Sequence, residues 1–92
     1  MEKEYNILVI YDISNDSIRN KIFNILSGYG NNIQKSSFLC ILSNRLYKKL
    51  LFDLSKIKID ENDSIISYKM YNFKKNIIGK KYDISDKGYL IL

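Results

Sequence analysis

The stretch Tyr5–Gly30 reads YNILVIYDISNDSIRNKIFNILSGYG and contains the strand and the helix that decide the fold. Its beginning, Tyr5–Tyr11, is almost continuously apolar and rich in Ile and Val, which is typical of a central strand covered on at least one face. Apolar residues then recur at helical spacing and form one stripe, which predicts a helix packed against the sheet; they are Ile18, Ile22, Ile25, Leu26 and Tyr29.

Polar and small residues mark both ends of this helix. Ser14, Asn15 and Asp16 offer side chains that can cap its N-terminus. Gly28 and Gly30 are expected to end it, because glycine tolerates the left-handed geometry of many C-terminal caps. The strand and the helix are therefore joined by a short connection that begins at Asp12.

The second half of the chain repeats this alternation. The segment Ile33–Leu42 is expected to be extended, either as one bent strand or as two short strands broken near Ser36 and Ser37. Ser43 is expected to cap a second helix, whose apolar stripe has a spacing of four and consists of Leu46, Leu50 and Leu54.

Alternating polarity over Ser64–Tyr71 predicts a half-buried strand with Ile66, Tyr68 and Met70 on one face. The acidic residues before it, Asp60, Glu61 and Asp63, lack the spacing and the glycine of a calcium loop and are interpreted as a solvated turn.

The order of elements predicts a single α+β domain over residues 1–92, a ferredoxin-like βαββαβ plait with an extra C-terminal strand. Right-handed crossovers place both helices on one face of the sheet. The tail, residues 72–92, ends in apolar GYLIL, which is expected to add to its own sheet or to that of a second protomer. A chain of 92 residues buries only a modest core, so a homodimer would add stability.

The composition of the chain limits the kinds of binding partner and the cellular compartment that we expect. The chain has 15 Lys and Arg against 10 Asp and Glu, a formal net charge of +5, which favours nucleic acid or an anionic membrane as a partner. A merely solvated basic surface is the alternative. No apolar run reaches the roughly 20 residues of a membrane span. The N-terminus lacks a signal-peptide pattern, so a cytoplasmic protein with no membrane partner is expected. The single Cys40 is interpreted as a small buried hydrophobic residue.

Asp12 is the strongest candidate for catalysis and for metal binding. It ends the first strand and precedes a helix, and its carboxylate could hold Mg²⁺ or Mn²⁺. The alternative is that Asp12 only caps or precedes the helix. The chain has no histidine, so a metal-bound water is the obvious base for hydrolysis. One carboxylate supplies few ligands for a metal ion, but a two-fold dimer would bring two copies of Asp12 together.

Three basic residues are candidates for nucleic-acid binding. Arg19 could grip a phosphate with its planar guanidinium group, and Lys21 and Lys35 could follow a sugar-phosphate backbone without reading bases. Each has a plainer interpretation, as an ion-paired arginine or as a solvated surface lysine.

The motifs in the first half of the chain, taken together, resemble the CRISPR-associated Cas-two family. Members have a strand that ends in a Tyr-Asp-Ile-Ser-type motif, a helix with an early arginine and a glycine end, and then a Gln-x-Ser-x-Phe element. The matching residues here are Tyr11, Asp12, Ile13, Ser14, Arg19, Gly30, Gln34, Ser36 and Phe38. One departure is Leu39, where the family often has Glu.

The resemblance implies a ferredoxin-like fold, a symmetric homodimer with exchanged terminal strands, and a divalent metal at Asp12. It implies work in spacer acquisition, where the dimer binds duplex DNA and bridges the Cas-one integrase, and metal-dependent endonuclease activity on RNA or DNA in some members. Tyr11, Ser14, Gln34, Ser36 and Phe38 are then supporting residues. The alternatives are a purely non-catalytic scaffold, a ribonuclease-toxin-like protein of the same fold, and a small regulatory module.

Overall fold

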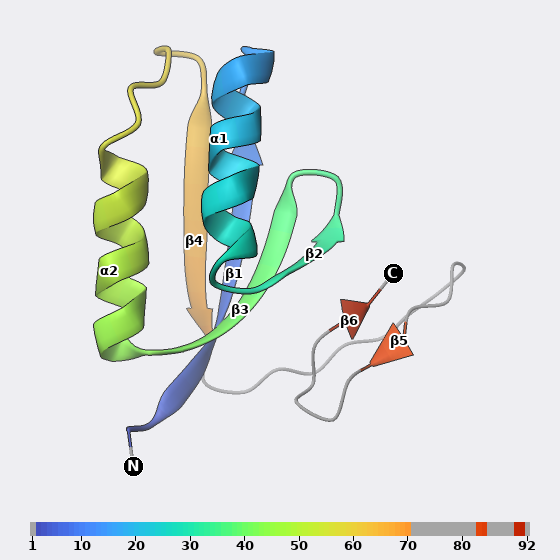
Figure 1. Cartoon of the computed structure of the whole chain (residues 1–92), viewed down its shortest axis with the longest axis vertical. Helices are drawn as coiled ribbons and strands as arrows, with labels where there is room; N and C mark the ends of the chain where they lie inside the picture. The colour runs from blue at the N-terminus through green and yellow to red at the C-terminus, as the bar shows by residue number, and fades with distance from the viewer. Residues whose placement is uncertain (1, 71–82, 85–89, 92) are drawn as a thin grey trace.

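The computed structural model describes residues 2–70, 83–84 and 90–91 of the chain (Figure 1). Four antiparallel strands form one sheet in the order β2-β3-β1-β4, and both helices cover the same face of it. This is the predicted ferredoxin-like α+β plait. Its elements are β1 Glu4–Asp12, α1 Asp16–Ser27, β2 Asn31–Gln34, β3 Ser37–Ser43, α2 Asn44–Ser55 and β4 Ser64–Met70.

The core lies between the sheet and the two helices. Alternate residues of β1 and β3 point into it, and the apolar stripes of α1 and α2 close it from above. Burying each large apolar side chain contributes about 1.5–3 kcal/mol. The residues that are at most 6% exposed in this layer include Ile7, Val9, Tyr11, Phe38, Cys40, Leu42, Ile22, Leu26, Leu50 and Leu54.

Both helices begin at capping residues that the sequence predicts. The Asn15 side-chain oxygen accepts a hydrogen bond of 2.9 Å from the backbone N–H of Ile18. The Ser43 hydroxyl accepts one of 3.2 Å from the backbone N–H of Leu46. Each cap satisfies a donor that the first helical turn leaves without a partner.

The helix α1 ends at the glycines as predicted, but not through the predicted backbone geometry. Gly28 caps the helix with a φ of −78°, in the right-handed region, so the expected left-handed cap was wrong. Gly30 is required by space instead, because a Cβ there would lie 2.4 Å from the Leu39 carbonyl oxygen and 2.7 Å from the Cys40 Cα. The missing side chain lets the connection after α1 pass directly over β3.

The segment after Gly30 forms two strands rather than one bent strand. The tight turn between β2 and β3 contains Ser36, whose φ of 63° is the one positive value among the described non-glycine residues. The Ser36 carbonyl oxygen accepts a hydrogen bond of 3.0 Å from the Tyr11 N–H, which ties the turn to the end of β1.

The second face of the sheet is left uncovered by the helices. The sequence correctly groups Ile66, Tyr68 and Met70 on one face of β4, where they lie opposite β1 residues of the same face. The strand is half-buried as predicted, but its covered side is the opposite one, since Ile66 is 45% and Tyr68 49% exposed. The helices cover the alternate residues of β4: Ile65 packs against the core and the Ser67 hydroxyl is hydrogen-bonded to Tyr47 of α2, so Ile66 and Tyr68 remain outside the core.

The C-terminal part contributes two more short strands, β5 Asp83–Ile84 and β6 Leu90–Ile91, which pair antiparallel with each other. Within the described residues, β6 lies in the predicted terminal segment but pairs with β5 in a separate two-stranded sheet and not with the main sheet. The rest of the predicted tail, residues 71–82, 85–89 and 92, lies outside the described residues. Within the described ranges, no helix is long and apolar enough to cross a membrane.

Candidate functional site at the end of the first strand

Asp12 is the last residue of β1, and its side chain is exposed. It lies opposite Ser64 of β4, two positions along the same face from Ile10, so it belongs to the uncovered face of the sheet. Asn15, and not Asp12, is the capping residue of α1. Asp12 is therefore not the helix cap, but it does precede the helix, as the other half of the plain interpretation supposed.

Three connections meet at this end of the sheet, which we call the strand tip: residues 13–15, the β2–β3 turn, and the end of the α2–β4 connection. The turn is held by the Tyr11–Ser36 backbone hydrogen bond. The α2–β4 connection is held by Asp63, whose carboxylate accepts a hydrogen bond of 3.1 Å from the Ser14 N–H. Segments distant in sequence thus meet beside the end of β1.

Arg19 organises the connection between β1 and α1. Its Nη1 donates a hydrogen bond of 3.0 Å to the Ile13 carbonyl oxygen, and its Nη2 forms an ion pair with the Asp16 carboxylate. Burial raises the pKa of the Tyr11 phenol, and the positive charge of Arg19 opposes that rise. Arg19 has protein partners, as the plainer interpretation supposed, yet its side chain is still 39% exposed.

The other predicted residues divide into two groups. Ser14 and Ser36 lie at the strand tip, and Lys35 is an exposed residue next to Ser36 in the same turn. Lys21 is exposed on α1, and Gln34 is exposed at the end of β2.

Phe38 is a core residue and not a surface group. It is 1% exposed and packs against the Phe23 ring at a centroid distance of 5.2 Å and an interplanar angle of 74°. The Tyr11 ring lies 6.4 Å away on the same side of the sheet. Phe38 therefore supports the end of β1 from within the core.

Asp63 is the residue of the strand tip that sequence reasoning missed. We interpreted it as part of a solvated acidic turn, but it is half-buried and bonded to a residue 49 positions away. A signal was present, because Asp63 immediately precedes β4 and the tips of β4 and β1 must lie side by side in the predicted antiparallel sheet.

The described part of one chain does not by itself build a metal centre. No cluster of three or more His, Cys, Asp or Glu side chains suited to an ion occurs among the described residues. Asp63 already accepts two backbone hydrogen bonds, so Asp12 is the exposed carboxylate that remains at the strand-tip end of the uncovered face. A single carboxylate does not fit a divalent ion well, since such ions take several oxygen ligands.

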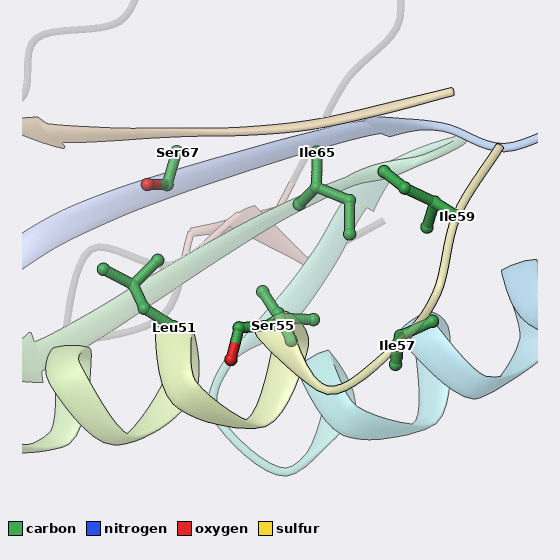
Figure 2. Close-up of a pocket in the computed structure, with 7 residues that line it drawn as sticks. Leu51, Ser55, Ile57, Ile59, Ile65 and Ser67 are labelled. Carbon is green, nitrogen blue, oxygen red and sulfur yellow. The ribbon is translucent and has the colours of Figure 1, made fainter. Parts of the chain in front are cut away.

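A cavity of about 270 Å³ lies on the helix-covered side between α2, the α2–β4 connection and β4 (Figure 2). Its lining residues carry no ionisable group, so it offers no acid, base or metal ligand for phosphodiester chemistry. They are Leu51, Leu54, Ser55, Ile57, Ile59, Ile65 and Ser67.

Comparison with known proteins agrees with this architecture of a small ferredoxin-like chain with an acidic strand tip. The chain belongs to the family described as CRISPR associated protein Cas2, whose model matches residues 5–76. That range contains β1 from its second residue, all elements from α1 to β4, and every residue of the strand tip.

Individual relatives and solved structures are also similar to this chain. The CRISPR-associated endoribonuclease Cas2 of Fusobacterium nucleatum is 37% identical over 87 residues, which cover 87% of this chain and 82% of that protein. A CRISPR-associated endoribonuclease Cas2 of Synechocystis is 39% identical over 61 residues, 66% of each chain. A crystal structure of a hypothetical protein from Thermus thermophilus has 29% identity and a TM-score of 0.75, over 84% of this chain and 93% of that one.

Proposed function

We propose that this protein is a CRISPR-associated endonuclease that hydrolyses phosphodiester bonds of RNA or DNA as a homodimer, with Asp12 as its catalytic residue. The observation that carries the proposal is the position of Asp12, exposed at the end of the central strand β1 on the uncovered face of the sheet. The similar proteins named endoribonucleases support the reaction class.

The uncovered face is the surface through which the homodimer would form. It carries Ile10, Ile66 and Tyr68, which are 38%, 45% and 49% exposed, and removing such residues from water is favourable. A two-fold interface sets the same patch against itself. Asp12 belongs to this face, so the dimer would bring two Asp12 carboxylates to one interface.

The paired carboxylates would supply the oxygen ligands that one chain lacks for Mg²⁺ or Mn²⁺. The bound ion would supply an activated water and would stabilise charge on the phosphate. The residues of the chain would hold the nucleic acid: Arg19 and Lys35 at the strand tip, and Lys21 on α1, would contact backbone phosphates.

The same dimer would serve spacer acquisition in the cytoplasm by binding duplex DNA and bridging the Cas-one integrase. The family match and the net charge of +5 support this role over the toxin-like and regulatory alternatives. A non-catalytic scaffold would need the basic surface and the dimer but not the Asp12 carboxylate, and this difference separates the two functions.

Substitution of Asp12 tests the catalytic role. Asp12→Asn keeps the shape of the side chain but removes its charge, and we expect Mg²⁺-dependent cleavage of labelled RNA and DNA to fall by about a hundredfold or more. Glu61→Gln is the matched control, because Glu61 is an exposed acidic residue outside the strand tip contacts described above. We expect EDTA to abolish the wild-type activity. Cleavage by Asp12→Asn at the wild-type rate would reject the catalytic role and leave the scaffold.

A further inference from the structure

We infer that the cavity on the helix-covered side is a docking site for the integrase, an inference that rests on the bridging role proposed above. Its occupant is a large apolar side chain carried by an acidic segment of that partner. The cavity lies between α2, the α2–β4 connection and β4 and has a volume of about 270 Å³ (Figure 2). An apolar cavity of about 150 Å³ is enough for a benzene ring, so this one has room for one large side chain.

The lining of the cavity suits an apolar group better than a polar ligand. Five of its seven residues are Leu or Ile. The Ser55 hydroxyl donates a hydrogen bond of 2.6 Å to the Phe52 carbonyl oxygen, and the Ser67 hydroxyl is hydrogen-bonded to the Tyr47 hydroxyl at 2.6 Å. Both polar side chains of the lining thus have partners within the chain. A base or a phosphate placed here would lose hydrogen bonds to water and gain few in return, which is costly.

Apolar residues beside the cavity are open to solvent. Leu51 lines the cavity and is 40% exposed, and Phe52, the next residue of α2, is 59% exposed. Neither residue belongs to the core described above. Exposed apolar residues next to an apolar cavity are typical of an interaction surface, because a partner side chain that enters the cavity removes both surfaces from water.

Lysines surround the cavity on its α2 side. The Lys56 Nζ lies 4.4 Å from the centroid of the Phe52 ring. Lys48 is exposed and lies three residues before Leu51, on the same side of the helix. Lys58 is an exposed residue of the α2–β4 connection.

Acidic residues do not cancel this charge on the α2 side. Asp53 is the one acidic residue between positions 48 and 59, and its carboxylate accepts a hydrogen bond from the Tyr29 hydroxyl. Asp60 and Glu61 follow at the end of the connection, in the turn before β4. Charge complementarity therefore indicates an acidic partner segment that lies along α2 and not over this turn.

The cavity would stay accessible in the proposed dimer. The dimer would form through the uncovered face, whereas the cavity lies on the side of the sheet that carries both helices (Figure 1). Two sheets packed through their uncovered faces leave the helix layers on the outer sides, and the two-fold axis gives one cavity to each side. Bridging requires two equivalent docking sites outside the dimer interface, and this placement supplies them.

The test measures binding of the full-length protein to the purified Cas-one integrase of the same CRISPR locus by isothermal titration calorimetry. Ser55→Trp places a ring in the cavity, and Leu51→Ala removes an exposed part of its lining. We expect each to weaken binding about tenfold or more, the scale of a residue central to an interface. Both residues are exposed, so circular dichroism should show folded variants.

A pair of neighbouring lysines tests the acidic character of the partner segment. Lys48→Glu should weaken integrase binding several-fold, and more at low salt than at high salt. Lys49→Glu makes the same change in charge two residues before Leu51, on another side of α2, and should bind as the wild type does. Equal losses in the two variants would overturn the acidic segment as the occupant.

The other outcomes separate this inference from the proposed function. If the wild type binds the integrase and both Ser55→Trp and Leu51→Ala bind equally well, the docking site is rejected and the bridging role stands. If the wild type does not bind the integrase, the bridging role is rejected and the docking site with it, while cleavage dependent on Asp12 is judged by its own assay. If Ser55→Trp instead dissociates the dimer or abolishes duplex binding, the occupant is a second copy or nucleic acid, and the inference is overturned.

Discussion

The two faces of the main sheet are built on opposite principles, although the same strands supply both. On the face covered by α1 and α2, the β1 residues Ile7, Val9 and Tyr11 are at most 3% exposed. On the other face, Ile10 is 38% exposed and Asp12 lies open to solvent. One layer is complete between the sheet and the helices, whereas the other is covered only in part: Leu39 of β3, which pairs with Leu8 on that face, is fully buried, but the residues towards β4 are exposed.

This difference between the two faces indicates which of them the proposed dimer would use. When an antiparallel sheet has one face in solvent, that face is normally polar. In this protein the uncovered face carries Ile66 and Tyr68 next to Ile10, and such exposed apolar residues are typical of an interaction surface. The covered face accounts for the stability of the fold, whereas the open face, with a carboxylate at its rim, accounts for the proposed dimer and its chemistry.

The largest effect is expected on the covered face. Ile22 of α1 is fully buried, and Ile22→Ala should lower the free energy of unfolding by about 2–5 kcal/mol through lost burial and the cavity it leaves. Phe52→Ala on α2 is the contrasting variant, because Phe52 is 59% exposed and should change stability by roughly 0.5 kcal/mol or less. Urea denaturation measures both, and equal losses would show that the helix layer is not the core described here.

The next largest effect is expected on the open face. Ile66→Asp places a charge in the proposed two-fold interface, where burial without a partner is costly, and should raise the dimer dissociation constant about a hundredfold. Ile66→Val is the control and should stay dimeric. Sedimentation velocity gives the oligomeric state, and circular dichroism should show a folded Ile66→Asp chain. A dimer unaffected by the Asp substitution would move the interface elsewhere.

The sequence predicted each face but not which face would be covered. Period-two alternation correctly placed Ile66, Tyr68 and Met70 together, because the side-chain repeat of a strand is local. Their exposure depends on which side the crossovers of α1 and α2 take, and that is a property of the whole chain. The two apolar faces of β1 gave no preference, since both read as continuous hydrophobic sequence.

The strand tip was partly predictable for the same reason. The position of Asp12 was predicted correctly because it depends only on where the first strand ends. Asp63 was missed because its partner, Ser14, is 49 positions away, and no local pattern records that contact. The role of Gly30 was likewise hidden, since it depends on how closely the chain approaches β3 and not on the local backbone conformation.

A smaller effect tests whether contacts between the two helices stabilise the chain without affecting the proposed dimer. The Tyr29 hydroxyl, after α1, donates a hydrogen bond of 2.6 Å to the Asp53 carboxylate on α2. Tyr29→Phe should cost about 1 kcal/mol at pH 7 without changing dimerisation. Chemical denaturation and sedimentation measure these two properties. A change in the dimer would show that the two faces are coupled.

The pH dependence of the same variant has a definite sign. Burial, followed by the bond to Asp53 and its charge, raises the pKa of Tyr29 from 10.0 to about 12. A raised pKa means that the folded state keeps the phenol proton after the unfolded state has lost it. The stabilisation is therefore present below pH 10 and is lost between about pH 10 and 12. The stability difference between wild type and Tyr29→Phe should shrink over that interval, and a difference constant with pH would contradict the assignment.

The smallest effect separates the strand tip from the rest of the basic surface. Lys35 lies in the turn beside Ser36, whereas Lys49 is an exposed lysine of α2. If nucleic acid follows the strand tip, Lys35→Ala should weaken binding to a duplex a few-fold and reduce the slope of log affinity against log salt by about one, the value for one lost phosphate contact. Lys49→Ala removes the same charge and should leave the slope unchanged. Fluorescence anisotropy over a salt series measures both, and equal slopes in the two variants would mean that the net charge of the protein, and not the position of Asp12, guides the nucleic acid.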